Sequence, residues 1–316
     1  MIVTLTAHPA LDRTIDLASP LRVGEVHTAV AAHEHAGGKG INVSRVVHAA
    51  GADTIAVLPL AAADPFAAVL AETGLPVQSV PARGSVRTNV ALTAPDGQTT
   101  KVNVPGAALS AAEATALTAT MVAAAERARW VVLAGSLPPG VGEDFYVRVI
   151  EAIRRSGGSR APRIAVDTSG TALAAVVEAG VADLIKPNDE ELAELTGVAW
   201  PAGADVADAA HTVARDLVPA KVGAALVTLG AAGAVLVAAE GAWAAAPPPI
   251  QVRSTVGAGD SALAGYLLAE SAGADPAGCL RHSIRYGAAA ASLVGTQAPS
   301  PSDLPPGDVP VRALTR

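Results

Sequence analysis

A glycine-rich stretch, TVGAGDSALAGY, runs from Thr255 to Tyr266 and places an aspartate at the start of an apolar helix. The unpaired N–H groups and the positive dipole of a helix start attract anions, and glycines let backbone amides approach a phosphate closely. Asp260 would then be a base held beside developing negative charge. The alternative interpretation is an aspartate that only favours the helix dipole.

A second glycine cluster, GGKGINVSR, occupies residues 37–45 and also enters an expected helix. The chain has only four lysines among its 22 basic Lys and Arg residues, and Lys39 is one of them. A lysine kept between glycines favours a compact positive charge for an anion, although an incidental surface lysine in a flexible loop is the alternative. Asn42 could hydrogen-bond a ligand hydroxyl or cap the helix.

Two further segments have residue types suited to a nucleotide. The first is KPNDEE at 186–191, where Asn188 and Glu191 are three residues apart in a first helical turn. Glu191 could hold water on a magnesium ion, but the same spacing is that of a capping box. The second, TLGAAG at 228–233, is either a simple hairpin turn or a hairpin whose backbone meets a nucleotide.

Several well-known motifs are absent from the sequence. No Gly-x-x-x-x-Gly-Lys-Ser/Thr occurs, which excludes a P-loop enzyme. The GAGDSA segment lacks the third glycine of a dinucleotide fingerprint and does not lie in the first βα turn, which argues against an NAD-dependent oxidoreductase. Ser136, in AGSLPPG, lacks the Gly-x-Ser-x-Gly context of a nucleophile elbow and is expected in a turn at a strand end, facing a ligand.

Composition narrows the class of protein further. The 316 residues carry a net charge of −7 and only 3% aromatic residues, which argues against nucleic acid or an anionic membrane as partner. The single cysteine, Cys279, excludes a disulfide framework within the chain and a cysteine metal site. No apolar run reaches the roughly 18–20 residues of a membrane span. We therefore expect a soluble cytoplasmic protein.

Short apolar runs alternate with alanine-rich helical stretches along the chain, which predicts an α/β fold with a mostly parallel sheet and helices on both of its faces. Expected strands are 2–7, 54–59, 77–81, 130–134, 163–167, 183–186, 225–229 and 234–238, and expected helices are 42–50, 65–73, 111–127, 143–155, 171–179, 190–196, 205–217, 258–270 and 278–293.

Two segments break this alternation. Residues 12–35 and 86–105 alternate polar and apolar positions, the second around a turn at Pro95–Gly97, and predict a small β-sheet lid on a single domain spanning 1–316. The tail from Ala298, rich in proline and serine, is expected to be irregular.

Taken together, the motifs resemble a known family. PALD (9–12), GGKGINVSR (37–45), VRTNV (86–90), GSLPPG (135–140), DTSG (167–170), KPNDEEL (186–192), TLGAAGA (228–234) and TVGAGDSALAGY (255–266) occur in this order. From Met1 to about Gly295 the chain is similar to the PfkB-type, ribokinase-like carbohydrate kinases. Within them it is most similar to the branch of 1-phosphofructokinases and tagatose-6-phosphate kinases.

The resemblance implies a ribokinase-like three-layer fold and an ATP- and Mg²⁺-dependent transfer of phosphate to a ketohexose phosphate. We expect the substrate to be D-fructose 1-phosphate, converted to fructose 1,6-bisphosphate. Tagatose-6-phosphate kinase and 6-phosphofructokinase activities are the alternatives within the class, and a non-catalytic sugar-phosphate sensor is the alternative outside it. A homodimer formed through the lids is also implied.

The resemblance also assigns roles to individual residues. Asp260 would take the proton from the sugar hydroxyl, and the amides of Gly257, Ala258, Gly259 and Asp260 would form the anion hole. Residues expected to bind the sugar phosphate are Asp12, Gly37, Gly38, Lys39, Asn42, Arg87, Lys101, Asn103 and Ser136, with Lys39 and Arg87 reaching its phosphate. Residues expected to bind ATP are Lys186, Asn188, Glu191, Thr228, Gly230 and Gly233, with Asn188 and Glu191 also serving Mg²⁺ through water.

Two positions depart from the family pattern. His8 replaces the asparagine that usually opens the Asn-Pro-Ser/Ala motif, and Lys101 lies where relatives vary between acidic and basic residues. Because Lys101 lies in a segment expected to approach the substrate phosphate, it bears on which sugar phosphate is preferred.

Overall fold

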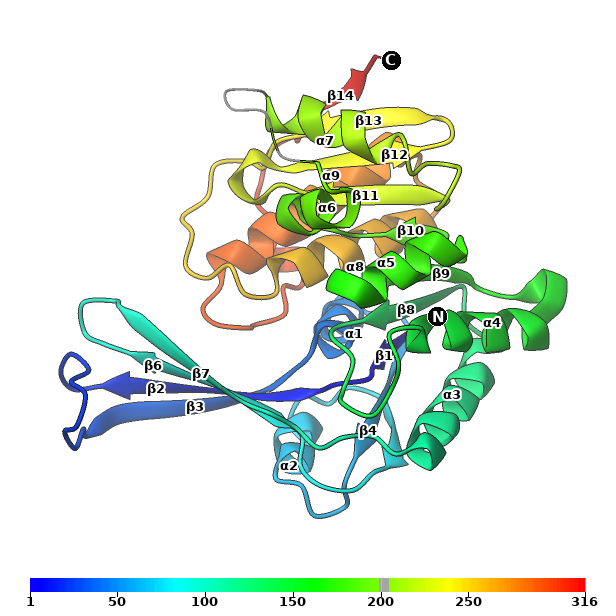
Figure 1. Cartoon of the computed structure of the whole chain (residues 1–316). Coiled ribbons are helices and arrows are strands. Elements are labelled where there is room, and N and C mark those ends of the chain that lie inside the picture. The colour runs from blue at the N-terminus through cyan, green and yellow to red at the C-terminus, as the bar shows by residue number, and fades with distance from the viewer. Residues whose placement is uncertain (199, 201–204, 316) are drawn as a thin grey trace.

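A ten-stranded sheet forms the centre of the protein, whose computed structural model describes residues 1–198, 200 and 205–315 (Figure 1). Its strand order is β14-β13-β12-β11-β10-β9-β8-β1-β4-β5. The seven strands from β11 to β5 run parallel, and β12, β13 and β14 are added as antiparallel neighbours. The strands are β1 (Ile2–Thr6), β4 (Thr54–Leu60), β5 (Val77–Pro81), β8 (Trp130–Ala134), β9 (Arg163–Asp167), β10 (Leu184–Ile185), β11 (Ala224–Thr228), β12 (Ala234–Ala238), β13 (Gly241–Ala245) and β14 (Val311–Leu314).

Helices cover both faces of this sheet, as the apolar strand sequences predict. In the described residues these are α1 (Lys39–Ala49), α2 (Phe66–Ala71), α3 (Ala111–Ala125), α4 (Phe145–Gly157), α5 (Gly170–Ala179), α6 (Asp189–Thr196), α7 (Val206–Ala214), α8 (Ala258–Ser271) and α9 (Pro276–Ser292), with short 3₁₀ turns at Gly158–Arg160, Gly230–Ala232 and Pro301–Asp303. Helices α3 to α7 pack on one face, and α1, α8 and α9 pack on the other.

Alternate residues of each strand supply the two halves of the core. In β8, Val131 and Leu133 point to the layer of α3–α7, whereas Trp130 and Val132 point to the layer of α1, α8 and α9. All four side chains are fully buried. The period of two along a strand therefore explains why these strands read as continuous apolar runs.

A separate four-stranded sheet, here called the small sheet, extends from the main body (Figure 1). Its order is β3-β2-β6-β7, from β2 (Ala10–Leu17), β3 (Ala29–Gly37), β6 (Arg87–Thr93) and β7 (Thr99–Val104). Two antiparallel hairpins, β2–β3 and β6–β7, join through the parallel pair β2–β6. The three-layer α/β fold and the small separate sheet predicted from the sequence are therefore confirmed.

The C-terminal tail corrects one prediction. It is not wholly irregular from Ala298, because Val311–Leu314 forms β14 and pairs with β13, a strand that the sequence pattern also missed. Strand β13 (GAWAA) consists mainly of alanine and glycine, which are depleted in strands, and β14 has only four residues at the sheet edge. No helix among the described residues is long and apolar enough to cross a membrane.

Candidate functional site

Three predicted site residues, and Asp167, lie at the carboxyl ends of parallel strands. Ser136 follows β8, Asp167 ends β9, Lys186 follows β10 and Thr228 ends β11. Carboxyl ends of parallel strands meet at one edge of a sheet, which is where ligands bind in open α/β folds. The topology therefore gathers residues that are far apart in the chain at one place.

Asp260 lies in the first turn of α8, whose preceding residue, Gly257, is in the left-handed region with φ of +77°. This conformation favours glycine and leaves the N–H groups of the first turn facing outward from the helix end. The Asp260 residue is only 6% exposed. The structure therefore combines the helix start and the glycines that the sequence indicated with a carboxylate that is buried.

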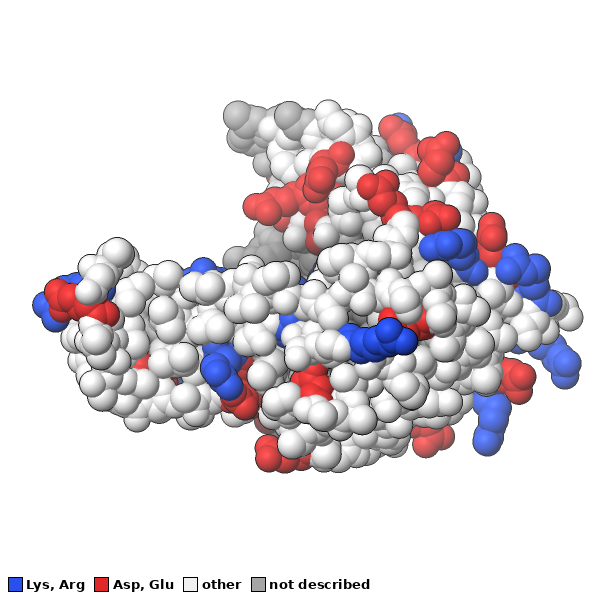
Figure 2. Space-filling model, turned by 60° about the horizontal axis from the view of Figure 1, so that its bottom comes forward, with Lys and Arg blue, Asp and Glu red and all other residues white. Residues whose placement is uncertain are grey.

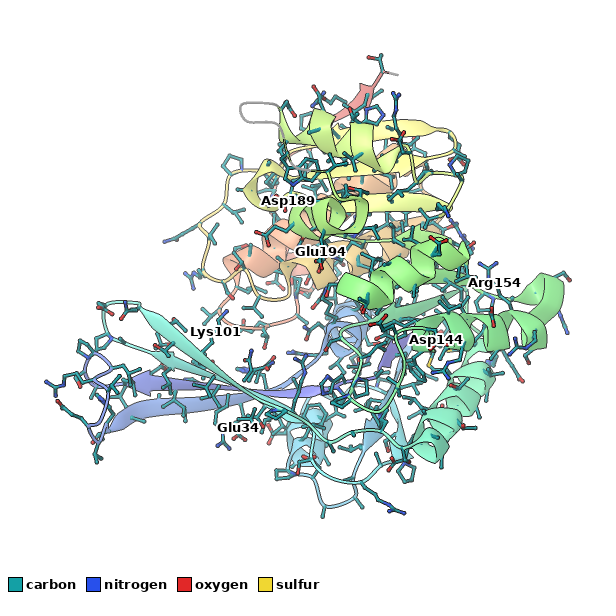
Figure 3. The ribbon with its side chains drawn as sticks, in the orientation of Figure 1. Glu34, Lys101, Asp144, Arg154, Asp189 and Glu194 are labelled. Carbon is teal, nitrogen blue, oxygen red and sulfur yellow. The ribbon has the colours of Figure 1, made fainter. Side chains whose placement is uncertain are left out.

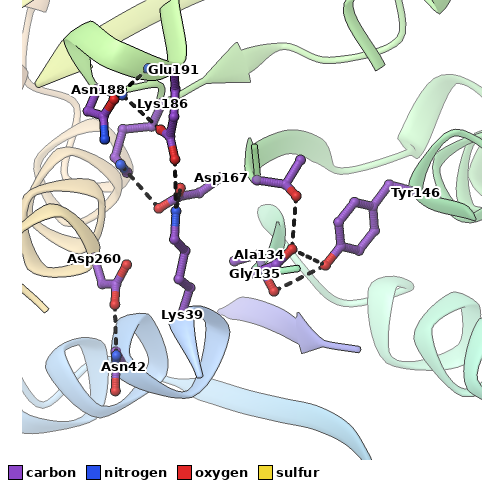
Figure 4. A network of polar contacts seen from close by, with 11 residues as sticks. Lys39, Asn42, Ala134, Gly135, Tyr146, Asp167, Lys186, Asn188, Glu191 and Asp260 are labelled. Atoms are coloured by element: carbon purple, nitrogen blue, oxygen red, sulfur yellow. Dashed lines mark hydrogen bonds and ion pairs between the residues drawn. The ribbon is translucent and has the colours of Figure 1, made fainter. Parts of the chain in front are cut away.

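The carboxylate of Asp260 has one hydrogen-bond donor among the described side chains. Asn42 Nδ2, from α1, donates to Asp260 Oδ2 at 2.7 Å (Figure 4). Burial and the nearby negative charge of Asp167 raise the pKa of Asp260 to about 6, against the lowering effect of Asn42 and of two lysines. The other amide atom, Asn42 Oδ1, is buried and has no hydrogen-bond partner among the described residues.

Asp167 is the centre of the charge network at this site (Figure 4). Its fully buried carboxylate lies 2.7 Å from Lys39 Nζ through Oδ1 and 3.3 Å from Lys186 Nζ through Oδ2. Burial alone would raise the pKa of Asp167, but Lys186 and Lys39 outweigh burial and keep it below its ordinary value. Two ammonium groups thus share the carboxylate of Asp167.

The sequence pattern assigns no role to Asp167, which belongs to the DTSG segment. The signal was present, because a carboxylate at the end of an apolar strand is expected at a ligand-binding edge. Its two lysine partners come from α1 and from the residue after β10, which no local pattern could reveal. Lys39, predicted to reach a substrate phosphate, is held by Asp167, and Asp167 and Glu191 raise its pKa although burial acts in the opposite direction.

Asn188 and Glu191 form a capping box at the start of α6. Asn188 Oδ1 accepts from the Glu191 amide at 2.7 Å, and the Asn188 amide donates to Glu191 Oε2 at 2.9 Å. The other oxygen, Glu191 Oε1, lies 3.7 Å from Lys39 Nζ. The capping box, one of the two alternatives for this spacing, is therefore formed. It leaves one carboxylate oxygen of Glu191 turned toward the charge network.

The 228–233 segment lies beside this capping box. Thr228 forms an isolated parallel bridge with Asn188, and the segment connects the antiparallel strands β11 and β12 through a 3₁₀ turn at Gly230–Ala232. Gly233 has φ of +101°, and a side chain there would collide with the backbone of Ala245. The predicted hairpin is thus formed, and it reaches the start of α6.

The substrate side of the predicted site lies on one face of the small sheet. Cross-strand pairing places His35, Asp12, Asn89 and Asn103 in a single row across its four strands. Asn89 Nδ2 donates to Asp12 Oδ1 at 2.8 Å. Burial raises the pKa of Asp12, although Asn89 lowers it. Gly37, at the end of β3, leaves the space that Asp12 occupies, since a β-carbon there would overlap its carboxylate.

Arg87 lies at the junction of the small sheet and the main body. Its Nε donates to the carbonyl oxygen of His8 at 3.3 Å, and the His8 ring contacts Ser136 Oγ through Nδ1, also at 3.3 Å. Burial and the charge of Arg87 lower the pKa of His8 to about 4, which keeps its ring neutral near pH 7. The departure at position 8 therefore lies directly against two predicted substrate-binding residues.

Lys101 lies farther out on the same face of the small sheet. It pairs with Ala91, which is four residues along β6 from Arg87, or about 13 Å at roughly 3.3 Å per residue. Lys101 lies on the side of the sheet toward the main body, whereas Glu34 lies on the opposite side (Figure 3). Arg87 and Lys101, both predicted to bind the sugar phosphate, therefore lie on the same face of the small sheet but at different distances from the main body.

Known proteins share both this fold and this sequence pattern. The chain is 36% identical over 308 residues to a 1-phosphofructokinase from Rhodobacter capsulatus, covering 96% of this chain and 94% of the relative. It is 32% identical over 305 residues to an ATP-dependent 6-phosphofructokinase isozyme 2 from Escherichia coli, covering 96% of each. A crystal structure of phosphofructokinase-2 from E. coli superposes with a TM-score of 0.87 at 31% identity, covering 96% of each chain.

These likenesses, with the sheet edge described above, define a ribokinase-type sugar kinase. The model of the pfkB family of carbohydrate kinases matches residues 8–303, and the chain belongs to that family. It is therefore an enzyme that transfers a phosphoryl group to a carbohydrate hydroxyl, with ATP as the phosphoryl donor.

Proposed function

We propose that the protein phosphorylates D-fructose 1-phosphate at its 6-hydroxyl, with Asp260 as the general base. The observation that carries this proposal is the buried Asp260 carboxylate at a glycine-rich helix start, beside a carboxylate that two lysines share. The 1-phosphofructokinase name of the Rhodobacter relative supports this substrate. The 6-phosphofructokinase from E. coli makes fructose 6-phosphate the first alternative.

The chemical step needs one proton acceptor. The sugar 6-hydroxyl loses its proton to Asp260 while its oxygen bonds to the γ-phosphorus of ATP, and the bond from that phosphorus to the bridging oxygen of ADP breaks. A base is most effective when its pKa lies near the working pH, and the pKa of about 6 for Asp260 meets that condition. Asn42 Nδ2 donates to this carboxylate and holds it in place.

Charge stabilisation comes from the surrounding groups. Phosphoryl transfer depends mainly on positioning and on compensation of the phosphate charge. The amides of Gly257, Ala258, Gly259 and Asp260 begin α8 and would receive the transferring group. A β-carbon on Gly259 would lie 3.3 Å from Lys186 Nζ, which places this ammonium beside the same helix start. Lys186 would therefore face the ATP phosphates and Lys39 the approaching sugar.

Magnesium fits this site only as an ion shared with phosphate and water. The described residues contain no group of three or more His, Cys, Asp or Glu side chains that could hold a metal. The capping box leaves Glu191 Oε1 turned toward the charge network, so this oxygen is the protein ligand available to the metal. The backbone amide of Asn188 holds the other oxygen, Oε2. Mg²⁺ prefers few carboxylates and several waters, and when bound it would neutralise charge on the ATP phosphates.

The small sheet would act as the lid over the sugar. Asp12 and Asn103 in its polar row, with Gly37, Gly38 and Ser136 at the base, would hold the sugar hydroxyls. Arg87 would bind the substrate phosphate, and Lys101 would add positive charge farther out. A closed lid excludes water, which would otherwise accept the phosphoryl group.

The opposite face of the small sheet supports a homodimer. Cross-strand pairing gathers Ile15, Val90, Leu92, Val102 and Val104 on that face, away from the polar row. Val102 and Val104 are 50% and 48% exposed, and the side of the small sheet visible in Figure 2 carries few charges between its tip and the main body. A second copy of this sheet would cover these residues and protect its edge strands.

A coupled assay of ADP release tests the activity and its substrate together. Purified protein is given ATP and Mg²⁺ with fructose 1-phosphate, fructose 6-phosphate or tagatose 6-phosphate. We expect the highest kcat/KM with fructose 1-phosphate and a bisphosphate product. A higher kcat/KM with either other sugar would contradict the substrate assignment, and no ADP release with any of them would favour a non-catalytic sensor.

A further inference from the structure

The carbonyl group of Gly135, directly after β8, receives two side-chain hydroxyls. Thr168 Oγ1 donates to Gly135 O at 2.9 Å, and the Tyr146 hydroxyl, from α4, donates to the same oxygen at 2.9 Å. The Tyr146 hydroxyl also lies within hydrogen-bond distance, 3.1 Å, of Ala134 O (Figure 4). Both side chains are buried, Tyr146 completely and Thr168 with 2% exposed.

The remaining contacts of Gly135 complete this restraint. Its N–H donates to the Asp167 carbonyl at 2.9 Å, so the N–H and C=O of this residue are both fixed. Its φ is +92°, and a β-carbon there would lie 4.0 Å from the backbone nitrogen and β-carbon of Lys39. Gly135 therefore turns the chain away from β8 beside the start of α1. Because both of its backbone groups are hydrogen-bonded, the position of the next residue, Ser136, is restrained.

We propose that Tyr146 and Thr168 are positioning residues that act through Gly135 to place Ser136 against the sugar. This inference rests on the proposed function, in which Ser136 binds a sugar hydroxyl. It also gives a role to Thr168, which belongs to the DTSG segment and which the chemistry at Asp260 does not use.

The chemistry of position 146 separates this role from simple packing. A buried hydroxyl lowers the stability of the fold unless it is hydrogen-bonded, whereas a phenylalanine ring would fill nearly the same volume without a polar group to satisfy. The adjacent residue, Phe145, packs into the same core without a hydroxyl. The Tyr146 hydroxyl contacts the carbonyl groups of Ala134 and Gly135, the two residues before Ser136. Its hydroxyl therefore restrains the loop, while its ring packs in the core.

The expected effect follows from the loss of one neutral hydrogen bond to a loop that must hold its position. Tyr146→Phe removes only the hydroxyl oxygen, and Thr168→Val removes the second donor with little change in volume. Because either donor remains when the other is removed, each single variant should raise the sugar-phosphate KM about 2- to 10-fold. The KM for ATP should stay within about twofold of the wild type. The double variant should show a larger rise than either single variant.

A double-mutant cycle with Ser136→Ala distinguishes positioning from general stability. If Tyr146 acts through Ser136, Tyr146→Phe should raise the sugar-phosphate KM in the wild type but have almost no further effect in the Ser136→Ala background. Thr168→Val should behave in the same way, and it serves alone if Tyr146→Phe does not fold. Phe145→Leu is the packing control, and it should lower the melting temperature while leaving both KM values unchanged.

Two results would overturn the inference. One is an equal effect of Tyr146→Phe and Thr168→Val with and without the Ser136 hydroxyl, and the other is an unchanged sugar-phosphate KM in Ser136→Ala. Both are measured relative to the wild type with whichever ketohexose phosphate it turns over. Absence of wild-type turnover with every ketohexose phosphate would instead contradict the proposed function, so the two failures are distinguishable.

Discussion

Replacing Arg87 with alanine should weaken binding of the sugar phosphate and leave ATP binding nearly unchanged. Among the described residues, the hydrogen bond of its guanidinium is made by Nε to the His8 carbonyl, which leaves the Nη groups for a ligand. Burial lowers the pKa of Arg87 against the opposing effect of Asp12, so the cation is partly stripped of water. The binding free energy from its contact with phosphate should therefore exceed that of a surface ion pair.

The magnitude follows from the charge-assisted bond. A hydrogen bond to a charged group contributes about 1.5–3 kcal/mol, which corresponds to roughly 10- to 150-fold in affinity. Arg87→Ala should raise the KM for fructose 1-phosphate by that factor. Arg87→Lys should recover only part of the loss, because an ammonium cannot replace the two-pronged guanidinium.

Steady-state kinetics with each substrate varied in turn measures this effect. The matched control is Arg83→Ala, which removes an exposed arginine four residues earlier and should leave both KM values unchanged. An unchanged sugar-phosphate KM in Arg87→Ala, or an equal rise in the KM for ATP, would refute the role given to this arginine.

Three other outcomes are expected. Asp167→Asn leaves two lysines without their buried counter-charge and should lower the free energy of unfolding by about 3 kcal/mol in urea titrations; an unchanged midpoint and slope would contradict the network. Val102→Asp should convert a dimer to a monomer in light scattering, whereas a wild type that is already monomeric or is tetrameric would contradict the proposed interface. His8→Asn should leave the pH profile of kcat/KM unchanged, because the pKa of His8, about 4, keeps the ring neutral above pH 5; a lost ionisation near pH 6 would show that His8 titrates there.

Sequence alone predicted the layers of the fold because the strands are buried on both faces. Runs such as Trp130–Ala134 are apolar throughout, and the helices between them have recognisable starts and ends. Strands β13 and β14 were missed for the opposite reason, since one is mostly alanine and the other is short and partly exposed. Local composition thus predicts an element only where packing imposes a pattern on it.

The site was predictable as a set of motifs but not as a network. Asn42 was expected to contact a sugar hydroxyl, and the structure adds that its amide donates to Asp260, which is 218 residues away in the chain. Asp167 joins Lys39 across a separation of 128 residues. Parallel strands bring such residues together at their carboxyl ends, and neither spacing nor residue type reveals which of them will pair.

The same limit applies to the small sheet. Its alternating pattern predicted a small sheet with a turn in the second segment, and the register places Asp12 and Asn103 in one row. The parallel pairing of β2 with β6 decides this arrangement, because a shift of one residue would move Asp12 to the apolar face. That pairing joins residues 77 positions apart in the chain, which no local signal specifies.

The substitution Asp260→Asn tests the central claim most directly. The amide keeps the shape of the side chain and can accept the hydrogen bond from Asn42, but it cannot take the sugar proton. General base catalysis typically contributes about 10²- to 10⁴-fold, so kcat should fall by at least that factor while ATP and the sugar phosphate still bind in calorimetry. The wild-type kcat/KM should also fall as the pH drops below about 6, because protonated Asp260 cannot act as a base, and the variant should lose this dependence. Near-normal turnover by the variant would contradict the assignment of Asp260 as the base.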